Sequence, residues 1–165
     1  MTQRESRLRL VRPGQKSEGS DMPIVAVVDT NVWVSAFLNP AGYPAQLITI
    51  GRTGRFVIVS SRPLMDELNE VLLRPRIMKI RQTTVEDVKA FVTGVGAVVQ
   101  LVPAANDVDL CRDPDDNAIL EAAIQGRATY VVSRDEDMTR DRDLAQHLRE
   151  RGIEAITVRR FLDLL

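Results

Sequence analysis

The chain of 165 residues has one cysteine, one histidine and few aromatic side chains, and each shortage excludes a class of site. Cys111 alone cannot form an intrachain disulfide or a thiolate zinc site, and His147 alone excludes a multi-histidine metal centre. Aromatic residues make up 4% of the chain, so stacking of single-stranded bases on aromatic rings has little support. The formal net charge of −1 excludes a strongly basic, histone-like binding mode but leaves room for a local basic patch.

Long apolar runs are also missing, so we expect a cytoplasmic protein with no signal peptide and no membrane span. Residues 1–22 are polar and basic, and their content of Gly, Ser, Pro and Lys predicts a disordered extension. Met22 stands directly before the first apolar run, so translation could also start there. Residues 23–165 have the length of a single domain with its own core. A contact of the extension with RNA or a partner is left open.

Strand-like and helix-like segments alternate through the rest of the chain. Apolar, β-prone runs predict strands over 24–28, 56–59, 97–102, 129–133 and 153–158. Capping residues and helical spacing predict helices over 31–38, 44–50, from Ser61 to Pro75, 84–95, from Pro114 to Gly126, 141–151 and 161–165. Because the strands are continuously apolar, we expect a parallel sheet covered on both faces. The fold class is therefore α/β, a three-layer sandwich with about five parallel strands.

Acidic side chains stand where these strands end or where the following helices begin. They are Asp29, Glu67, the pair Asp115 and Asp116, and Asp135. The carboxyl ends of parallel strands share one edge of the sheet, where such folds place their sites. Carboxylates crowded there repel each other unless a cation neutralises them, and Mg²⁺ or Mn²⁺ suits oxygen ligands. The pattern favours a metal-dependent phosphoryl-transfer site.

Each acid also has a plainer interpretation. Asp29 could cap the next helix, and Glu67 could belong to a solvated helix face. Asp113 is a natural helix cap, and acids in a first helical turn interact well with the helix dipole. Asp135 and Asp137 could lie in a solvated loop, although Asp137 could also reach a metal through water. If each acid had only its plainer role, their common position at one edge of the sheet would be a coincidence. The plainer interpretations are therefore the weaker account.

Four segments together resemble the PIN-domain nucleases, and most closely the VapC-like ribonuclease toxins of prokaryotic toxin–antitoxin systems. The segments are Val28-Asp29-Thr30-Asn31-Val32, Glu67-Leu68, Asp113-Pro114-Asp115-Asp116-Asn117 and Val132-Ser133-Arg134-Asp135-Glu136-Asp137. The resemblance covers about residues 23–160. It implies a Rossmann-like sheet, one or two Mg²⁺ or Mn²⁺ ions, RNA cleavage, a cognate antitoxin and a homodimer.

The resemblance also implies roles for individual residues. The four acidic metal ligands would be Asp29, Glu67, Asp116 and Asp135, with Asp115 as an alternative to Asp116. Asn31 and Ser133 match polar helpers of catalysis that orient water or phosphate.

An RNA substrate requires positive charge close to this acidic edge. The densest basic stretch of the folded part comprises Arg74, Arg76, Lys79 and Arg81, and Arg62 and Arg134 lie closer to the expected metals. The alternative is an ordinary solvated segment.

Besides a receiver-type phosphorylation domain, which would need a lysine after the last strand where this chain has Arg159 and Arg160, two other functions compete with the nuclease. One is a haloacid-dehalogenase-like Mg²⁺ phosphatase, which also uses an aspartate after its first strand, as Asp29 is here. Such an enzyme needs a second aspartate two residues later, where this chain has Asn31. A PIN-like module that binds RNA or a partner without cutting is the other, although a degenerate module would be expected to have lost part of the acidic set.

Overall fold

The computed structural model describes residues 22–134 and 142–165. Residues 1–21 of the predicted extension, and the predicted site residues Asp135 and Asp137, lie outside these ranges. In chain order the elements are β1 (Val25–Val28), α2 (Thr30–Leu38), α3 (Tyr43–Arg52), β2 (Val57–Ser61), α4 (Arg62–Leu72), α5 (Pro75–Arg81), α6 (Val85–Val98), β3 (Gln100–Val102), α7 (Pro114–Gln125), β4 (Tyr130–Ser133), α9 (Arg142–Arg149), β5 (Glu154–Thr157) and α10 (Val158–Leu164).

The strands form one sheet of five, in the order β3-β2-β1-β4-β5, and every neighbouring pair is parallel. The prediction of a parallel α/β sheet of about five strands is therefore confirmed. The chain moves outward from β1 through β2 to β3 and then returns to place β4 on the other side of β1. The strand order thus reverses between β1 and β4, and ligands of open α/β sheets bind where it does so, at the carboxyl ends.

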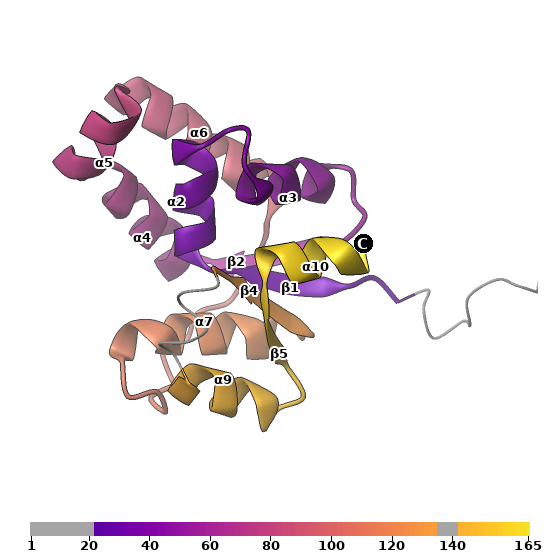
Figure 1. The fold of residues 1–165 in the computed structure, drawn as a ribbon. Coiled ribbons are helices and arrows are strands. Elements are labelled where there is room, and N and C mark those ends of the chain that lie inside the picture. Colours follow the sequence, from indigo (N-terminus) through magenta and orange to yellow (C-terminus); the bar gives the residue numbers. More distant parts are fainter. Residues whose placement is uncertain (1–21, 135–141) are drawn as a thin grey trace, which may run out of the picture.

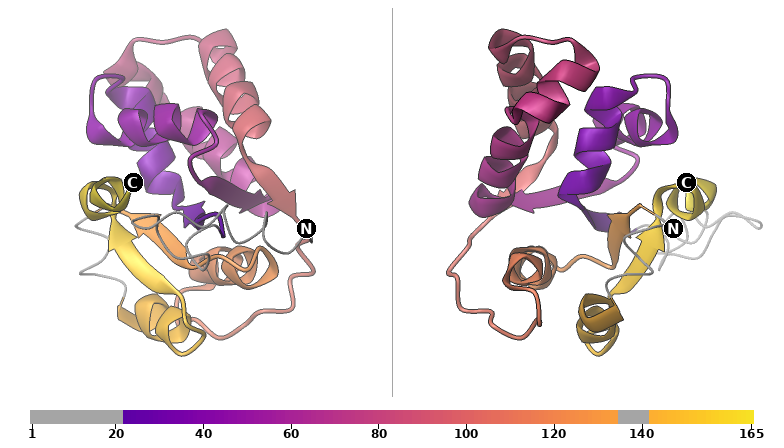
Figure 2. Two further views of the ribbon diagram at one scale, coloured as in Figure 1. Left: turned by 90° about the vertical axis from the view of Figure 1, so that its right-hand side faces the viewer. Right: turned by 60° about the vertical axis from the view of Figure 1, so that its left-hand side comes forward.

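Helices cover both faces of the sheet, as the continuously apolar strands predict (Figure 1). Because successive side chains of a strand point to opposite faces, Ala26 and Val28 enter one core and Val27 enters the other. The first core packs the sheet against α2, α3, α4, α6 and α10, and the second packs it against α7 and α9. The connection from β3 to α7 passes from one helical layer to the other (Figure 2).

Two predicted strand boundaries are wrong and one helix was missed, because helix formation extends further than expected. The predicted strand over 97–102 shrinks to Gln100–Val102, since α6 continues to Val98 with Val88 and Val95 buried on its inner face. Pro75 ends α4 as predicted but also opens α5, because proline lacks only an N–H that the first helical turn leaves unpaired. Val158, predicted to end the last strand, begins α10, where the Thr157 hydroxyl accepts a hydrogen bond from the Arg160 N–H at 3.2 Å.

Gly126 follows α7 as predicted, but its role differs from that of a left-handed helix cap. Its φ is −83°, and the positive φ falls on Arg127 at 52°. A Cβ at position 126 would lie 2.8 Å from Cγ2 of Val59 on β2. The glycine therefore permits close packing of the end of α7 against the sheet. None of the helices within the described ranges is long and apolar enough to cross a membrane.

Candidate active site

A cleft of about 790 Å³ opens at the carboxyl edge of the sheet. It is bounded by the end of β1, by α4, by the start of α7 with the residues before it, and by the start of α9. The described residues that line it are Asp29, Thr30, Asn31, Glu67, Arg112, Asp113, Asp115, Asp116, Ile119, Arg142, Asp143 and Gln146. Stretches of sequence that are far apart therefore contribute carboxylates to one cavity.

Asp29 is held at the junction of β1 and α2. Its backbone N–H donates to the Val132 carbonyl at 2.9 Å, which continues the pairing of β1 with β4. Asp29 occupies the cap position of α2, yet its side chain makes no capping hydrogen bond. Oδ2 instead accepts a hydrogen bond from the Ser133 hydroxyl at 3.3 Å. The plainer interpretation of Asp29 as a helix cap therefore does not describe its carboxylate.

Glu67 is carried to the cleft by the amphipathic helix α4. Ser61 caps this helix by accepting from the Leu64 N–H at 3.5 Å, and Leu64, Leu68 and Leu72 form its buried face. Glu67 lies beside that face, half-buried, and its Oε2 accepts a hydrogen bond from the Thr30 hydroxyl at 3.0 Å. The plainer interpretation, a solvated helix face, therefore does not hold for Glu67.

The electrostatic surroundings of Glu67 oppose its negative charge. Burial raises the pKa of the Glu67 carboxyl above its ordinary value, and the charges of Asp115 and Glu70 raise it further. The Thr30 hydrogen bond and the Arg74 guanidinium act in the opposite direction without cancelling the shift. A carboxylate that is destabilised in this way at a cleft is typical of a functional site.

The start of α7 contributes the third group of acids. Asp113 caps the helix as predicted, because its Oδ1 accepts from the Asp115 N–H at 3.0 Å. Asp116 is 8% exposed and lies on the inner side of the helix. Asp115 is exposed but acts electrostatically on Glu67. Both line the cleft, so the choice between Asp115 and Asp116 as a metal ligand stays open.

The connection before α7 is fixed by side chains of that helix, a feature that the sequence analysis missed. The buried Glu121 accepts from the N–H groups of Ala105 and Asn106, at 2.8 and 3.0 Å. Asn117 accepts from the N–H groups of Leu110 and Cys111, at 3.1 and 2.8 Å. The sequence carried a signal for this feature: Glu121 and Asn117 lie in a helix that follows a long polar stretch, and the backbone N–H groups of such a stretch need acceptors. These bonds place the residues that precede Asp113 at the cleft.

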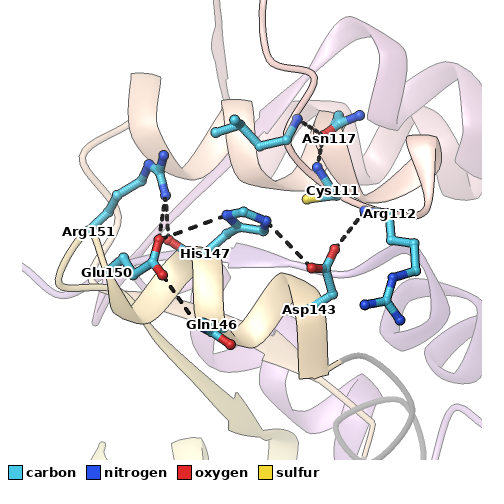
Figure 3. Close-up of polar contacts among 9 residues, drawn as sticks. Cys111, Arg112, Asn117, Asp143, Gln146, His147, Glu150 and Arg151 are labelled. Carbon is cyan, nitrogen blue, oxygen red and sulfur yellow. Dashed lines mark hydrogen bonds and ion pairs between the residues drawn. The ribbon is translucent and has the colours of Figure 1, made fainter.

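Four further cleft residues were also missed: Arg112, Arg142, Asp143 and Gln146. Asp143 accepts a hydrogen bond from the Arg112 N–H at 2.6 Å, and Nε2 of His147 lies 3.5 Å from its Oδ1 (Figure 3). His147 thus has a structural role on α9. The signal was the spacing of Asp143 and His147, four residues apart on one helix face.

The predicted helper residues and basic residues lie at different places. Asn31 is exposed and lines the cleft, whereas the buried Ser133 donates to Asp29. Arg62 lies 3.8 Å from Asp66 at an exposed ion pair, and Arg134 is exposed at the end of β4.

The basic stretch Arg74 to Arg81 lies on or beside α5, which packs against α2 and α4 at the outer end of the helical layer (Figure 1). Nε of Arg81 donates a hydrogen bond to the Phe37 carbonyl at 2.9 Å, and this bond links α5 to α2. The predicted contacts of Arg62, Arg74, Arg76, Lys79, Arg81 and Arg134 with nucleic acid remain predictions.

The donor set of the cleft suits a hard divalent cation. Every candidate ligand is a carboxylate or a neutral oxygen donor, which is the chemistry that Mg²⁺ and Mn²⁺ prefer. Within residues 22–134 and 142–165, no three acidic, His or Cys side chains converge closely enough to hold a metal ion. Burial is the largest cause of the raised pKa of Glu67, and the negative charges of Asp115 and Glu70 add to it.

The fold and the cleft define a class: a parallel α/β domain with an acidic site at the point where the strand order reverses. Residues 25–137 match the PIN domain family, and the chain belongs to that family. PIN domains have a nuclease-type fold that acts on nucleic acid and typically binds divalent metal ions. The chain is also similar to the uncharacterized protein MJ1680 of Methanocaldococcus jannaschii, with 27% identity over 130 residues that cover 79% of this chain and 83% of that protein.

Proposed function

We propose that this protein is a metal-dependent endoribonuclease that hydrolyses phosphodiester bonds of RNA. One observation carries the proposal: Asp29, Glu67 and the pair Asp115 and Asp116 come from three separate stretches of the chain and line one cleft. Helix capping does not account for this arrangement, because Asp113 caps α7 and the Asp29 side chain makes no capping hydrogen bond to α2.

Asp29, Glu67 and Asp116 would hold one or two Mg²⁺ or Mn²⁺ ions, with Asp115 as the alternative to Asp116. Asp135 would complete the set, and Asp137 would assist through water; both lie outside the described residues. A cation bound by such a set lowers the pKa of a bound water and stabilises the charge on the leaving oxygen. Thr30 and Ser133 keep the Glu67 and Asp29 carboxylates oriented, and Asn31 is placed to orient water or phosphate.

The resemblance to VapC-like ribonucleases supports a narrower role as the toxin of a toxin–antitoxin pair. In that role the protein would act in the cytoplasm, form a homodimer and be held inactive by a cognate antitoxin. Expression without a partner would then arrest growth, and the Asp29→Asn variant would not.

Cleavage of a labelled single-stranded RNA of mixed sequence tests the proposal. The wild-type protein should cut it with Mg²⁺ or Mn²⁺ present, produce 5′-phosphate ends, and lose this activity in EDTA and in Asp29→Asn. RNA binding without metal-dependent cleavage would instead identify a non-cleaving PIN-like module. Release of phosphate from a phosphomonoester with intact RNA would identify a phosphatase.

A further inference from the structure

Two arginine side chains interrupt the acidic lining of the cleft. Among the described residues that line it, the cations are Arg112 and Arg142, and both are exposed. They face six acidic residues: Asp29, Glu67, Asp113, Asp115, Asp116 and Asp143. RNA carries a phosphate at every nucleotide, so a strand entering this cleft needs cations beside the phosphates that the metal site does not neutralise. None of the basic residues selected from the sequence lines the cleft.

The backbone that carries Arg112 is fixed although it belongs to no helix or strand. Three consecutive N–H groups, those of Leu110, Cys111 and Arg112, donate to side chains of neighbouring helices. Asn117 of α7 accepts the first two, and Oδ2 of Asp143 accepts the third at 2.6 Å. This last bond joins the segment to α9, which lies on the opposite face of the sheet from α4 (Figure 1).

Asp143 is itself held in place by its own helix. Nε2 of His147 lies 3.5 Å from Oδ1 of Asp143, and Nδ1 of His147 lies 4.0 Å from Oε2 of Glu150. Figure 3 shows this chain of contacts, with the Arg112 backbone N–H at one end and no dashed line to the Arg112 guanidinium. Within the described ranges the Arg112 guanidinium joins none of the ion pairs of this cluster. Its backbone is therefore held while its charge remains available to a ligand.

We propose that Arg112 binds an RNA phosphate next to the one that is cut, and that Asp143 is a positioning residue that holds Arg112 there. The inference rests on the proposed function for the identity of the ligand. Arginine suits this task because its planar guanidinium pairs with two phosphate oxygens at once. A fixed backbone reduces the entropy lost when that side chain becomes ordered on binding.

The test measures binding of a labelled single-stranded RNA of mixed sequence to Asp29→Asn protein in Mg²⁺, so that cleavage does not interfere. Adding Arg112→Gln should weaken binding about tenfold, since a charge-assisted contact is lost. It should also reduce the slope of log affinity against log salt by about 0.7, the value for one phosphate contact on a single strand. The matched control is Arg149→Gln, an exposed arginine on α9 away from this cleft, which should leave affinity and slope unchanged.

The positioning role of Asp143 is tested by a double-mutant cycle. Asp143→Ala should weaken binding nearly as much as Arg112→Gln, and the two changes together should be no worse than Arg112→Gln alone. Asp143→Asn should restore affinity to within about twofold, because its amide oxygen still accepts the Arg112 N–H. In the protein with Asp29 intact, Arg112→Gln should raise KM more than it lowers kcat.

Two results would overturn the inference: a salt slope unchanged by Arg112→Gln, or additive losses from the Asp143 and Arg112 changes. Failure of the proposed function looks different. It appears as absence of metal-dependent cleavage by the wild-type protein, and it leaves the Arg112 effect on RNA binding measurable.

Discussion

The Ser133 hydroxyl donates a hydrogen bond to Oδ2 of Asp29 at 3.3 Å, and the two residues are 104 positions apart in the chain. They meet because β1 and β4 are neighbours at the point where the strand order reverses. The bond orients the carboxylate toward the cleft, in the manner of the outer-shell hydrogen bonds that orient metal ligands.

Ser133→Ala should therefore weaken the metal site without removing a ligand. We expect RNA cleavage at limiting Mg²⁺ to fall roughly 10- to 100-fold, with partial recovery at higher Mg²⁺. The measurement is the cleavage rate as a function of Mg²⁺ concentration. Thr49→Val is the control, since the Thr49 hydroxyl donates only to the Ala45 carbonyl within its own exposed helix turn. Equal rates for Ser133→Ala and wild type at every Mg²⁺ concentration would contradict the role of this bond.

Glu67→Gln should stabilise the metal-free protein while abolishing its activity. Burial raises the pKa of Glu67 in the folded state, so the folded protein binds the proton more tightly than the unfolded chain does. Stability of the wild type therefore falls as pH rises from the ordinary carboxyl range through that raised pKa. At neutral pH in EDTA the variant should have a Tm roughly 1–3 °C higher.

The difference in Tm should vanish at pH values below the ordinary carboxyl range, where Glu67 is protonated in both states. Saturating Mn²⁺ should reverse the order of the two proteins, since the variant has lost one carboxylate ligand and a cation that binds it more weakly stabilises it less. A lower Tm for Glu67→Gln at neutral pH in EDTA would show that the carboxylate is not destabilised in the fold.

Glu121→Ala should loosen the connection before α7. The change leaves the N–H groups of Ala105 and Asn106 without their acceptor, and we expect a loss of about 1–3 kcal/mol in the free energy of unfolding. Urea denaturation measures it, with Gln125→Ala on the exposed side of the same helix as the control. A loss no larger than that of the control would mean that water replaces the carboxylate at no cost.

Gly126→Ala and Gly94→Ala should change stability in opposite directions. A Cβ at position 126 would lie 2.8 and 3.0 Å from Val59 side-chain atoms and 3.0 Å from the Ala122 carbonyl, so α7 and β2 must separate, at about 1–3 kcal/mol. A Cβ at position 94 meets only the Arg52 side chain at 3.7 Å, and alanine there should stabilise α6 by roughly 0.5–1 kcal/mol. The two thermal melts test both, and a gain in Tm for Gly126→Ala would contradict the packing described for that glycine.

The fold was predictable from sequence because its determinants are local. Continuous apolar runs gave the parallel strands, and Ser61, Thr84 and Asp113 cap helices where their positions predict. The start of the third strand was wrong since residues 97 and 98 suit either a strand or the last turn of α6. Only the packing of Val95 against the core settles that competition.

That Asp29, Glu67, Asp115 and Asp116 lie at one edge of the sheet was predictable, because the ends of strands reveal which residues share an edge. Their supporting residues were not, since the hydrogen bond from Thr30 to Glu67 joins residues 37 positions apart and that from Arg112 to Asp143 joins residues 31 apart. Such pairs depend on how the layers pack, which no local pattern encodes. The basic residues selected from the sequence do not line the cleft, for the same reason. The selection followed the density of charge along the sequence, which is highest at α5, whereas the arginines that line the cleft, Arg112 and Arg142, stand singly in the sequence.

The central claim, that Asp29 and Glu67 serve one metal site, is tested most directly by comparing RNA cleavage rates of the wild type, Asp29→Asn, Glu67→Gln and the double variant at saturating Mg²⁺. Residues that act as a unit are strongly non-additive. Each single change should lower the rate roughly 100-fold or more, and the double variant should be little slower than the slower single variant. Losses that multiply in the double variant, or near-normal cleavage by either single variant, would contradict the claim.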